Sequence, residues 1–275
     1  MLRAFVAVVA CCTTLSAQAP SAVSESTKDE IGVLTHQVQS DYQAGKTLVR
    51  VLLPEKLEKD RRYSVVYVLP VEAGRENRYG DGLAEVKKHD LHNKFKAVFV
   101  APTFSHLPWY GDHPTKKDVR QESYFLKVVL PFVEKSYPVQ AEAKGRYLLG
   151  FSKSGWGAFS LLLRHPDEFH RAAAWDAPLL MDKPGQYGSG EIFGTVENFA
   201  NYHVSKLLES KAEHLQKEKR LILTGYGVFR EQHVKANELM DKLKIAHEYR
   251  DGPTREHDWH SGWVSEAVEL LLKSK

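Results

Sequence analysis

The stretch "RYLLGFSKSGWGAFSLLL", residues 146–163, decides the fold of this 275-residue chain. It begins with an apolar run of strand-forming residues, passes through a short turn of Gly and Ser, and continues as an almost wholly apolar helix. A strand that turns directly into a buried helix is the unit from which parallel sheets with covering helices are built. The stretch therefore predicts an α/β domain.

The rest of the chain repeats this alternation of strand and helix. Apolar runs bounded by Pro, Gly or polar residues predict strands at 47–54, 63–70, 96–104, 146–152, 170–178, 220–227 and 247–253. Helical spacing of apolar residues predicts helices over 125–133, 230–243 and 263–271, the first with a kink at Pro131. We therefore expect one domain, residues 29–275, with a mostly parallel sheet and helices on both faces. Residues 182–200, rich in Gly, predict a long excursion at the sheet edge where binding sites form.

The N-terminus has the pattern of a signal peptide. Arg3 provides the positive charge, Ala4 to Cys12 form an apolar segment, and Ala17-Gln18-Ala19 is a small-x-small cleavage site. Residues 1–19 are thus expected to be removed, residues 20–28 to form a flexible leader, and the protein to be secreted or periplasmic. A loose lipoprotein pattern at Val8 to Cys11 leaves lipid anchoring as a second possibility. Both cysteines lie in this segment, so the mature chain would contain no thiol.

Charge and hydropathy narrow the class of partner. The formal net charge is +3 and the charged fraction 27%, which gives no indication of nucleic-acid binding. No stretch after the signal segment is long and apolar enough to span a bilayer, so stable membrane insertion is not expected.

The turn in the deciding stretch holds two serines, and only one suits a nucleophile elbow. In the pattern G-x-S-x-G, small residues two before and two after the serine let strand and helix approach closely. With Ser152 as the nucleophile those positions hold Gly150 and Ser154, and Gly155 follows. With Ser154 as the nucleophile, Trp156 would occupy a crowded position. The spacing therefore selects Ser152.

A suitable histidine follows the last predicted strand, in "REHDWHSGW" (255–263). With the elbow, His257-Asp258-Trp259 makes the chain resemble the putative-esterase branch of the α/β-hydrolases, which contains esterase D, feruloyl esterases and mycolyltransferases. Members show G-x-S-x-G-G and then H-x-W before the final helix, and Ser154 departs from the first motif. The resemblance implies the α/β-hydrolase fold, with His257 as the base and His260 as the runner-up.

The same resemblance implies an acid and an oxyanion hole. Two carboxylates keep the chain order Ser, acid, His: Asp176 ends a predicted strand behind an apolar run, and Glu231 begins a predicted helix. Asp176 is preferred, because a carboxylate that ends a buried strand needs a partner. Lys153 would give one oxyanion N–H, and Val71 or Glu72 the other. Members often carry His-Gly there, whereas this chain reads "LPVEAG" (69–74).

Aromatic residues and the remaining histidines complete the candidate site. Trp109, Tyr110, Trp156 and Trp259 are expected to line a substrate cleft suited to a small-molecule or carbohydrate-linked ester. Histidine pairs at 89–92 and 257–260 lack a metal-binding motif, so no metal is predicted, and the triad chemistry needs no cofactor.

These residues predict a secreted serine hydrolase that cleaves a carboxylic ester or transfers its acyl group. The alternative is a catalytically inactive α/β-hydrolase fold that binds a ligand such as a carbohydrate. The altered loop at 69–74 favours the alternative, whereas the order of elbow and histidine favours the enzyme.

Overall fold

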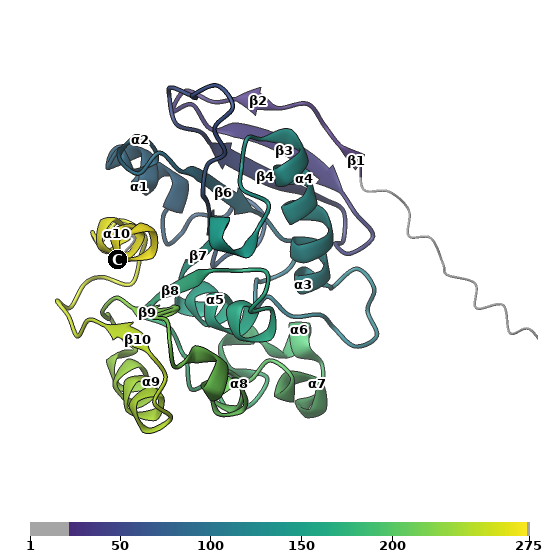
Figure 1. Cartoon of the computed structure of the whole chain (residues 1–275). Helices are drawn as coiled ribbons and strands as arrows, with labels where there is room; N and C mark the ends of the chain where they lie inside the picture. The colour runs from purple at the N-terminus through teal and green to yellow at the C-terminus, as the bar shows by residue number, and fades with distance from the viewer. Residues whose placement is uncertain (1–21, 274–275) are drawn as a thin grey trace, which may run out of the picture.

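The strand that precedes the Gly/Ser turn is β7 (Arg146–Phe151), and it lies inside a ten-stranded sheet (Figure 1). The structure is a computed structural model that describes residues 22–273. The predicted signal peptide, residues 1–19, lies outside the described residues.

The order of the strands is β1-β3-β4-β6-β5-β7-β8-β9-β10, with β2 paired to β3. Neighbours from β6 to β10 run parallel, whereas β3 and β4 pair antiparallel at one side. The mostly parallel sheet is therefore confirmed. The bounds are β1 (Ala22–Val23), β2 (Thr27–Lys28), β3 (Leu34–Gln39), β4 (Lys46–Leu52), β5 (Val65–Val68), β6 (Val98–Pro102), β8 (Arg171–Trp175), β9 (Leu221–Leu223) and β10 (His247–Tyr249).

The N-terminal edge of the sheet differs from the sequence prediction. Residues 20–28 were expected to be a flexible leader, but Ala22–Val23 and Thr27–Lys28 pair antiparallel with β3. β3 itself is not an apolar run, because in LTHQVQ polar residues alternate with apolar ones. An antiparallel strand with one solvated face needs apolar residues only at every second position, so a search for apolar runs does not find it.

Helices cover both faces of the sheet, as predicted (Figure 1). Their bounds are α1 (Gly82–Lys88), α2 (Leu91–Lys94), α3 (Gln121–Tyr124), α4 (Leu130–Ser136), α5 (Ser152–Arg164), α6 (Gly190–Phe193), α7 (Val196–Ala200), α8 (Val204–Lys211), α9 (Arg230–Lys242) and α10 (Val264–Leu272). Short 3₁₀ turns occur at Ala143–Gly145, Gln186–Gly188 and Ala212–Leu215. The excursion predicted at 182–200 thus carries α6 and α7. No helix within residues 22–273 is both long and apolar enough to cross a membrane.

The kink expected at Pro131 takes the form of a π turn. Phe125–Val129 is π-helical and lies between α3 and α4, so that Pro131 falls in the first turn of α4. Proline has no N–H to donate to the carbonyl one turn earlier. In the first turn of an α-helix that hydrogen bond is not made, so Pro131 is tolerated there. The apolar stripe of this segment is kept, with Phe125 and Val129 in the core.

Alternation along the central strands divides the core into two layers. In β5, Val65 and Tyr67 face the layer under α5, whereas Val66 and Val68 face the layer under α1 and α10. All four are almost fully buried. Because β5, β7 and β8 run parallel, their carboxyl ends and the loops that follow them meet at one edge of the sheet. The candidate residues follow these strands.

Candidate active site

Ser152 occupies a strained turn between β7 and α5. It is the first residue of α5, directly after Phe151 at the end of β7, and its φ is 51°. A positive φ is costly for a residue with a side chain, and such strain is common at active sites. The close approach explains Gly150, because a Cβ there would lie 2.3 Å from the carbonyl oxygen of Ser154. The serine is 7% exposed.

Ser154, which departs from the family motif, holds this turn together. Its side chain is fully buried. The Oγ accepts a hydrogen bond from the Phe151 N–H (3.0 Å) and donates one to the Phe151 carbonyl (2.9 Å). The hydroxyl therefore fixes the residue before Ser152, which a glycine in that position could not do.

His257 joins Ser152 to Asp176. Its Nε2 lies 3.0 Å from Ser152 Oγ, and its Nδ1 lies 2.5 Å from Asp176 Oδ2. An ionised carboxylate only accepts hydrogen bonds, so Nδ1–H donates to Asp176 and Nε2 is free to accept from the serine hydroxyl. The histidine side chain is 22% exposed, so a ligand can reach it from solvent.

Asp176 is fully buried at the end of β8, with a φ of 41°. Its Oδ2 accepts from the Val228 N–H (2.9 Å) and its Oδ1 from the Phe229 N–H (2.7 Å). Burial alone would raise the pKa of this carboxyl, but the hydrogen bonds from His257 and from these backbone groups hold the pKa below its ordinary value. The group is therefore a carboxylate at neutral pH.

The runner-up acid and base lie elsewhere. The Glu231 side chain is 80% exposed in the first turn of α9 and pairs with Lys235 at 2.5 Å. His260 Nδ1 contacts Glu85 Oε1 of α1 at 2.8 Å. Of the two candidate acids, only Asp176 contacts His257. Within residues 22–273, no group of three or more His, Cys, Asp or Glu side chains is placed to hold a metal ion.

The predicted oxyanion donors flank the same edge. Lys153 is the second residue of α5, and the first N–H groups of a helix have no acceptor within it. Val71 and Glu72 follow β5, and no hydrogen bond of either N–H is found within residues 22–273. Tyr110 supports this loop, because its hydroxyl donates to the Pro70 carbonyl at 2.6 Å. Burial lowers the pKa of the Lys153 ammonium, although the Glu72 carboxylate opposes the shift.

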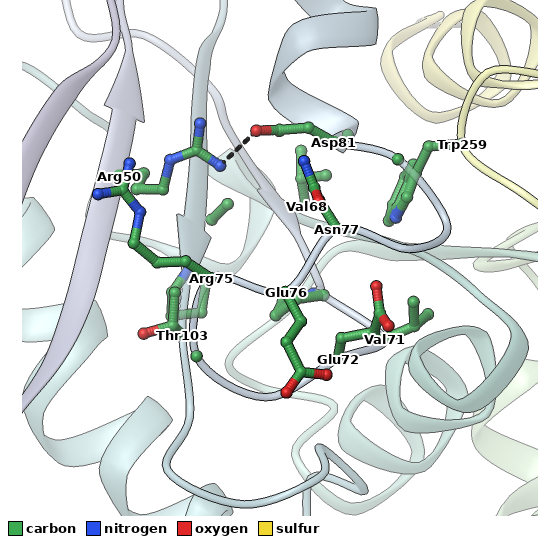
Figure 2. A pocket seen from close by; sticks show the side chains of 16 residues that line it. Arg50, Val68, Val71, Glu72, Arg75, Glu76, Asn77, Asp81, Thr103 and Trp259 are labelled. Carbon is green, nitrogen blue, oxygen red and sulfur yellow. Dashed lines mark ion pairs between the residues drawn. The ribbon is translucent and has the colours of Figure 1, made fainter. Parts of the chain in front are cut away.

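A cavity of about 150 Å³ lies against the loop that carries Val71 and Glu72 (Figure 2). An ion pair of 2.7 Å between Arg50 and Asp81 stands on its far side, and Asp81 also caps α1 through the Leu83 N–H (2.9 Å). None of the triad residues lines this cavity. The ion pair and the cap therefore hold the end of this loop at the start of α1, and they do not contact the triad.

The structure places the four predicted substrate-binding aromatics in the core. Trp109, Tyr110 and Trp156 are fully buried, and Trp259 is 2% exposed, although Trp259 lines the cavity in Figure 2. Phe199 of α7 stacks on Trp156 with ring centroids 6.3 Å apart. Trp109 and Trp156 thus pack against Phe193 of the excursion, and Tyr110 packs against Phe104, so these three rings do not face a ligand. This corrects the expectation that they line the cleft.

Residues that sequence reasoning did not select surround His257. The rings of Tyr79 and Phe229 lie 5.7 Å and 5.8 Å from the imidazole, centroid to centroid. His233 is 1% exposed, and its Nε2 accepts from the N–H of Ala177, next to Asp176. In the sequence, His233 has helical spacing with Ala236 and Met240, which are buried in α9. This spacing could have predicted that the His233 side chain faces the core.

Solved structures of known proteins resemble this chain in fold. A solved ferulic acid esterase is 22% identical in sequence and superposes with a TM-score of 0.68. The alignment covers 90% of this chain and 97% of the esterase chain. The S-formylglutathione hydrolase FrmB of Staphylococcus aureus is 18% identical, covers 88% and 99%, and has a TM-score of 0.70. These likenesses show the α/β-hydrolase fold.

Sequence comparison identifies the family. Esterase Rv1288 of Mycobacterium tuberculosis (strain ATCC 25618 / H37Rv) is 26% identical over 157 residues, which are 56% of this chain and 32% of that protein. The chain thus matches only about a third of the length of this relative. The family model "Esterase: Putative esterase" matches residues 40–263, from before β4 to the residue that precedes α10. The chain therefore belongs to the putative esterase family.

Proposed function

We propose that this chain is a serine hydrolase that cleaves a carboxylic ester, or transfers its acyl group, through Ser152, His257 and Asp176. One observation carries the proposal: Ser152 Oγ, His257 Nε2, His257 Nδ1 and Asp176 Oδ2 form a continuous hydrogen-bonded chain with distances of 3.0 Å and 2.5 Å. Such a chain activates a hydroxyl that is otherwise a poor nucleophile.

The mechanism follows from these contacts. Ser152 Oγ attacks the ester carbonyl carbon while His257 Nε2 takes the hydroxyl proton. The oxyanion is held by the N–H of Lys153 and by that of Val71 or Glu72. The intermediate collapses, the C–O bond to the alcohol breaks, and the leaving oxygen takes the proton from Nε2. Water or another acceptor then attacks the acyl-enzyme, with His257 again as the base, and restores Ser152.

Asp176 supports this cycle through orientation and charge. Its carboxylate accepts from Nδ1–H, which fixes the tautomer that leaves Nε2 unprotonated, and it stabilises the imidazolium that forms during attack. The backbone donors of Val228 and Phe229 hold the carboxylate in place. Two solved relatives are named for ferulic acid and for S-formylglutathione, which is a thioester. For this chain the proposed substrate is a small-molecule or carbohydrate-linked ester.

The proposal includes a location and a domain division. Residues 1–19 act as a signal peptide for secretion or export to the periplasm, and the predicted domain of residues 29–275, extended by β1 and β2 at its N-terminal side, forms a single catalytic domain. The pattern of Arg3, the apolar segment and Ala17-Gln18-Ala19 supports the signal peptide. N-terminal sequencing of the exported protein tests it, and a product that still begins at Met1 contradicts it.

Labelling with a fluorophosphonate tests the function. We expect the purified chain to gain one adduct by intact-protein mass spectrometry, and peptide mapping to place it on Ser152. The Ser160→Ala variant is the matched control, because Ser160 lies in the same helix but is buried and bonded to the Tyr202 carbonyl. An unlabelled wild-type chain that hydrolyses no ester would leave the ligand-binding alternative instead.

A further inference from the structure

Around Phe229, whose ring lies beside that of His257, the protein exposes apolar side chains that the proposed mechanism does not use. Large exposed apolar side chains within residues 22–273 are Ile31, Leu57, Tyr187, Val196 and Val228. Tyr187 is 48% exposed, and its ring stands edge-on to that of Phe229, with centroids 5.5 Å apart at 88°. Val228, 72% exposed, precedes Phe229 in the chain. We call Tyr187 and Phe229 the aromatic ledge.

The aromatic ledge is fixed to the triad. The N–H of Phe229 donates to Asp176 Oδ1, and the Phe229 ring centroid lies 5.8 Å from that of His257. Tyr187 comes from the excursion after β8 and reaches the ledge through its contact with Phe229. Phe229 is thus held beside the imidazole, and Tyr187 beside Phe229, before any ligand binds, which lowers the entropy cost of binding there.

The chemistry decides which part of an ester lies at the ledge. The leaving oxygen takes its proton from His257 Nε2, so it must come within hydrogen-bond reach of that atom. The acyl carbon is bonded to Ser152 Oγ, and its oxyanion points to the backbone donors that include Lys153. The group attached to the leaving oxygen is therefore the part of the substrate nearest the imidazole and the Phe229 ring beside it.

We propose that the aromatic ledge binds the alcohol part of the ester, and that this part is neutral, apolar and carries an aromatic ring. The inference rests on the proposed ester hydrolysis and names the substrate class for that site. Edge-to-face contact with Tyr187 and Phe229 suits an aromatic ring, and covering Tyr187 removes apolar area from water.

The charges near the ledge agree with a neutral group. Arg230, which follows Phe229, forms two hydrogen bonds with Asp251, at 3.0 Å and 2.5 Å. Glu231 pairs with Lys235. These four side chains are paired with one another, so none of them offers an unmatched charge to an ionic alcohol group such as a phosphorylated sugar.

Three esters and one variant test the ledge. Benzyl acetate and ethyl acetate differ only in the alcohol, and ethyl phenylacetate places the ring on the acyl side. The variant is Tyr187→Asn, because Tyr187 has φ 52° and ψ 27°, a left-handed conformation that asparagine tolerates. We expect the kcat/KM for benzyl acetate to fall about tenfold, while that for ethyl acetate stays within about twofold.

The matched control is Leu57→Asn. Leu57 is 45% exposed, similar to Tyr187, and lies between β4 and β5, at the edge where the parallel strands begin and opposite the triad. It should change no ester by more than about twofold.

The outcomes separate the ledge from the function beneath it. A wild-type chain that hydrolyses ethyl acetate but does not prefer benzyl acetate overturns the ledge alone. So does a Tyr187→Asn variant that slows ethyl phenylacetate rather than benzyl acetate, since the ledge would then hold the acyl group. If the chain hydrolyses none of the three and takes no fluorophosphonate, both the function and the ledge are overturned.

Discussion

His233 Nε2 accepts a hydrogen bond of 2.7 Å from the N–H of Ala177, the residue that follows Asp176. A protonated imidazole has no acceptor, so His233 must be neutral for this contact to exist. The ring is 1% exposed on α9. It therefore connects α9 to the turn in which Asp176 holds a positive φ.

His233 should make stability depend on pH. Burial lowers its pKa to about 4, against the opposing effect of the Asp176 and Asp251 charges, whereas the unfolded chain has a histidine pKa of about 6.5. Between these values the unfolded state binds the extra proton, so stability is lost as the pH falls. We expect the wild type to lose on the order of 2 kcal/mol from this group between pH 7 and pH 5.

The His233→Phe variant isolates this contribution. At pH 7 it should unfold about 1–3 kcal/mol more easily than the wild type, because the Ala177 N–H is left without a partner. Urea unfolding of both proteins at pH 7 and pH 5 should show the difference shrinking at the lower pH. Equal differences at the two pH values would show that His233 does not titrate in this way.

The two serines of the elbow should separate activity from stability. Ser152→Ala should lose fluorophosphonate labelling and about 10⁴-fold or more in kcat, with little change in unfolding. Ser154→Ala should keep the labelling but lower the free energy of unfolding by about 1–3 kcal/mol, because the Phe151 N–H and carbonyl lose a buried partner. Labelling of the Ser152→Ala chain would place the nucleophile elsewhere.

Local sequence patterns predict the sheet better than the site. The strands at 63–70 and 146–152 are found as β5 and β7, because a buried parallel strand is an unbroken apolar run. The elbow is equally local, since Gly150, Ser152 and Ser154 interact within one turn. These features depend on residues that are neighbours in the chain, so they can be predicted from a short stretch of sequence.

Long-range packing could not be predicted in the same way. Trp156 and Phe229 are both aromatic and both lie near the triad in the chain or in space. In the structure Phe199 stacks on Trp156, whereas the ring of Phe229 lies beside His257. The order of the chain does not say which ring is covered, because the excursion at 182–200 provides both the cover for Trp156 and the exposed Tyr187. The choice between Asp176 and Glu231 likewise depended on which carboxylate reaches an imidazole far along the chain.

Asp176→Asn and Glu231→Gln should differ by orders of magnitude. The asparagine amide carries no negative charge and can donate a hydrogen bond to Nδ1. The imidazole proton can then move to Nε2, which no longer accepts from Ser152, and kcat should fall by about 10⁴. Glu231 is exposed and, among residues 22–273, is bonded only to Lys235, so Glu231→Gln should be close to normal. Steady-state kinetics on ethyl acetate compares the two, and the reverse pattern would assign the acid to Glu231.

Trp156 should matter for stability rather than for substrate affinity. The side chain is fully buried between Trp109, Phe193 and Phe199. Trp156→Ala should destabilise the protein by about 3–5 kcal/mol, because it leaves a large cavity. Trp156→Phe keeps part of this packing and should restore much of the stability while KM stays near the wild-type value. A rise in KM for the stable Phe variant would return the ring to the substrate site.

The two histidines of "HDWH" should have separate roles. His257→Ala removes the base beside Ser152 and should abolish fluorophosphonate labelling. His260 binds Glu85 of α1, which also contacts Lys88 (3.1 Å) and His89 (3.3 Å), so Glu85 keeps the Lys88 ion pair and the His89 contact without it.

His260→Ala should therefore keep the labelling rate within a few-fold and lose less than about 1 kcal/mol of stability, since its side chain is half exposed. The measurement is the rate of adduct formation at a fixed probe concentration. If His260→Ala also prevents labelling, the tie between α1 and the 255–263 loop is needed to hold His257 against Ser152, and His260 becomes a positioning residue rather than a surface contact.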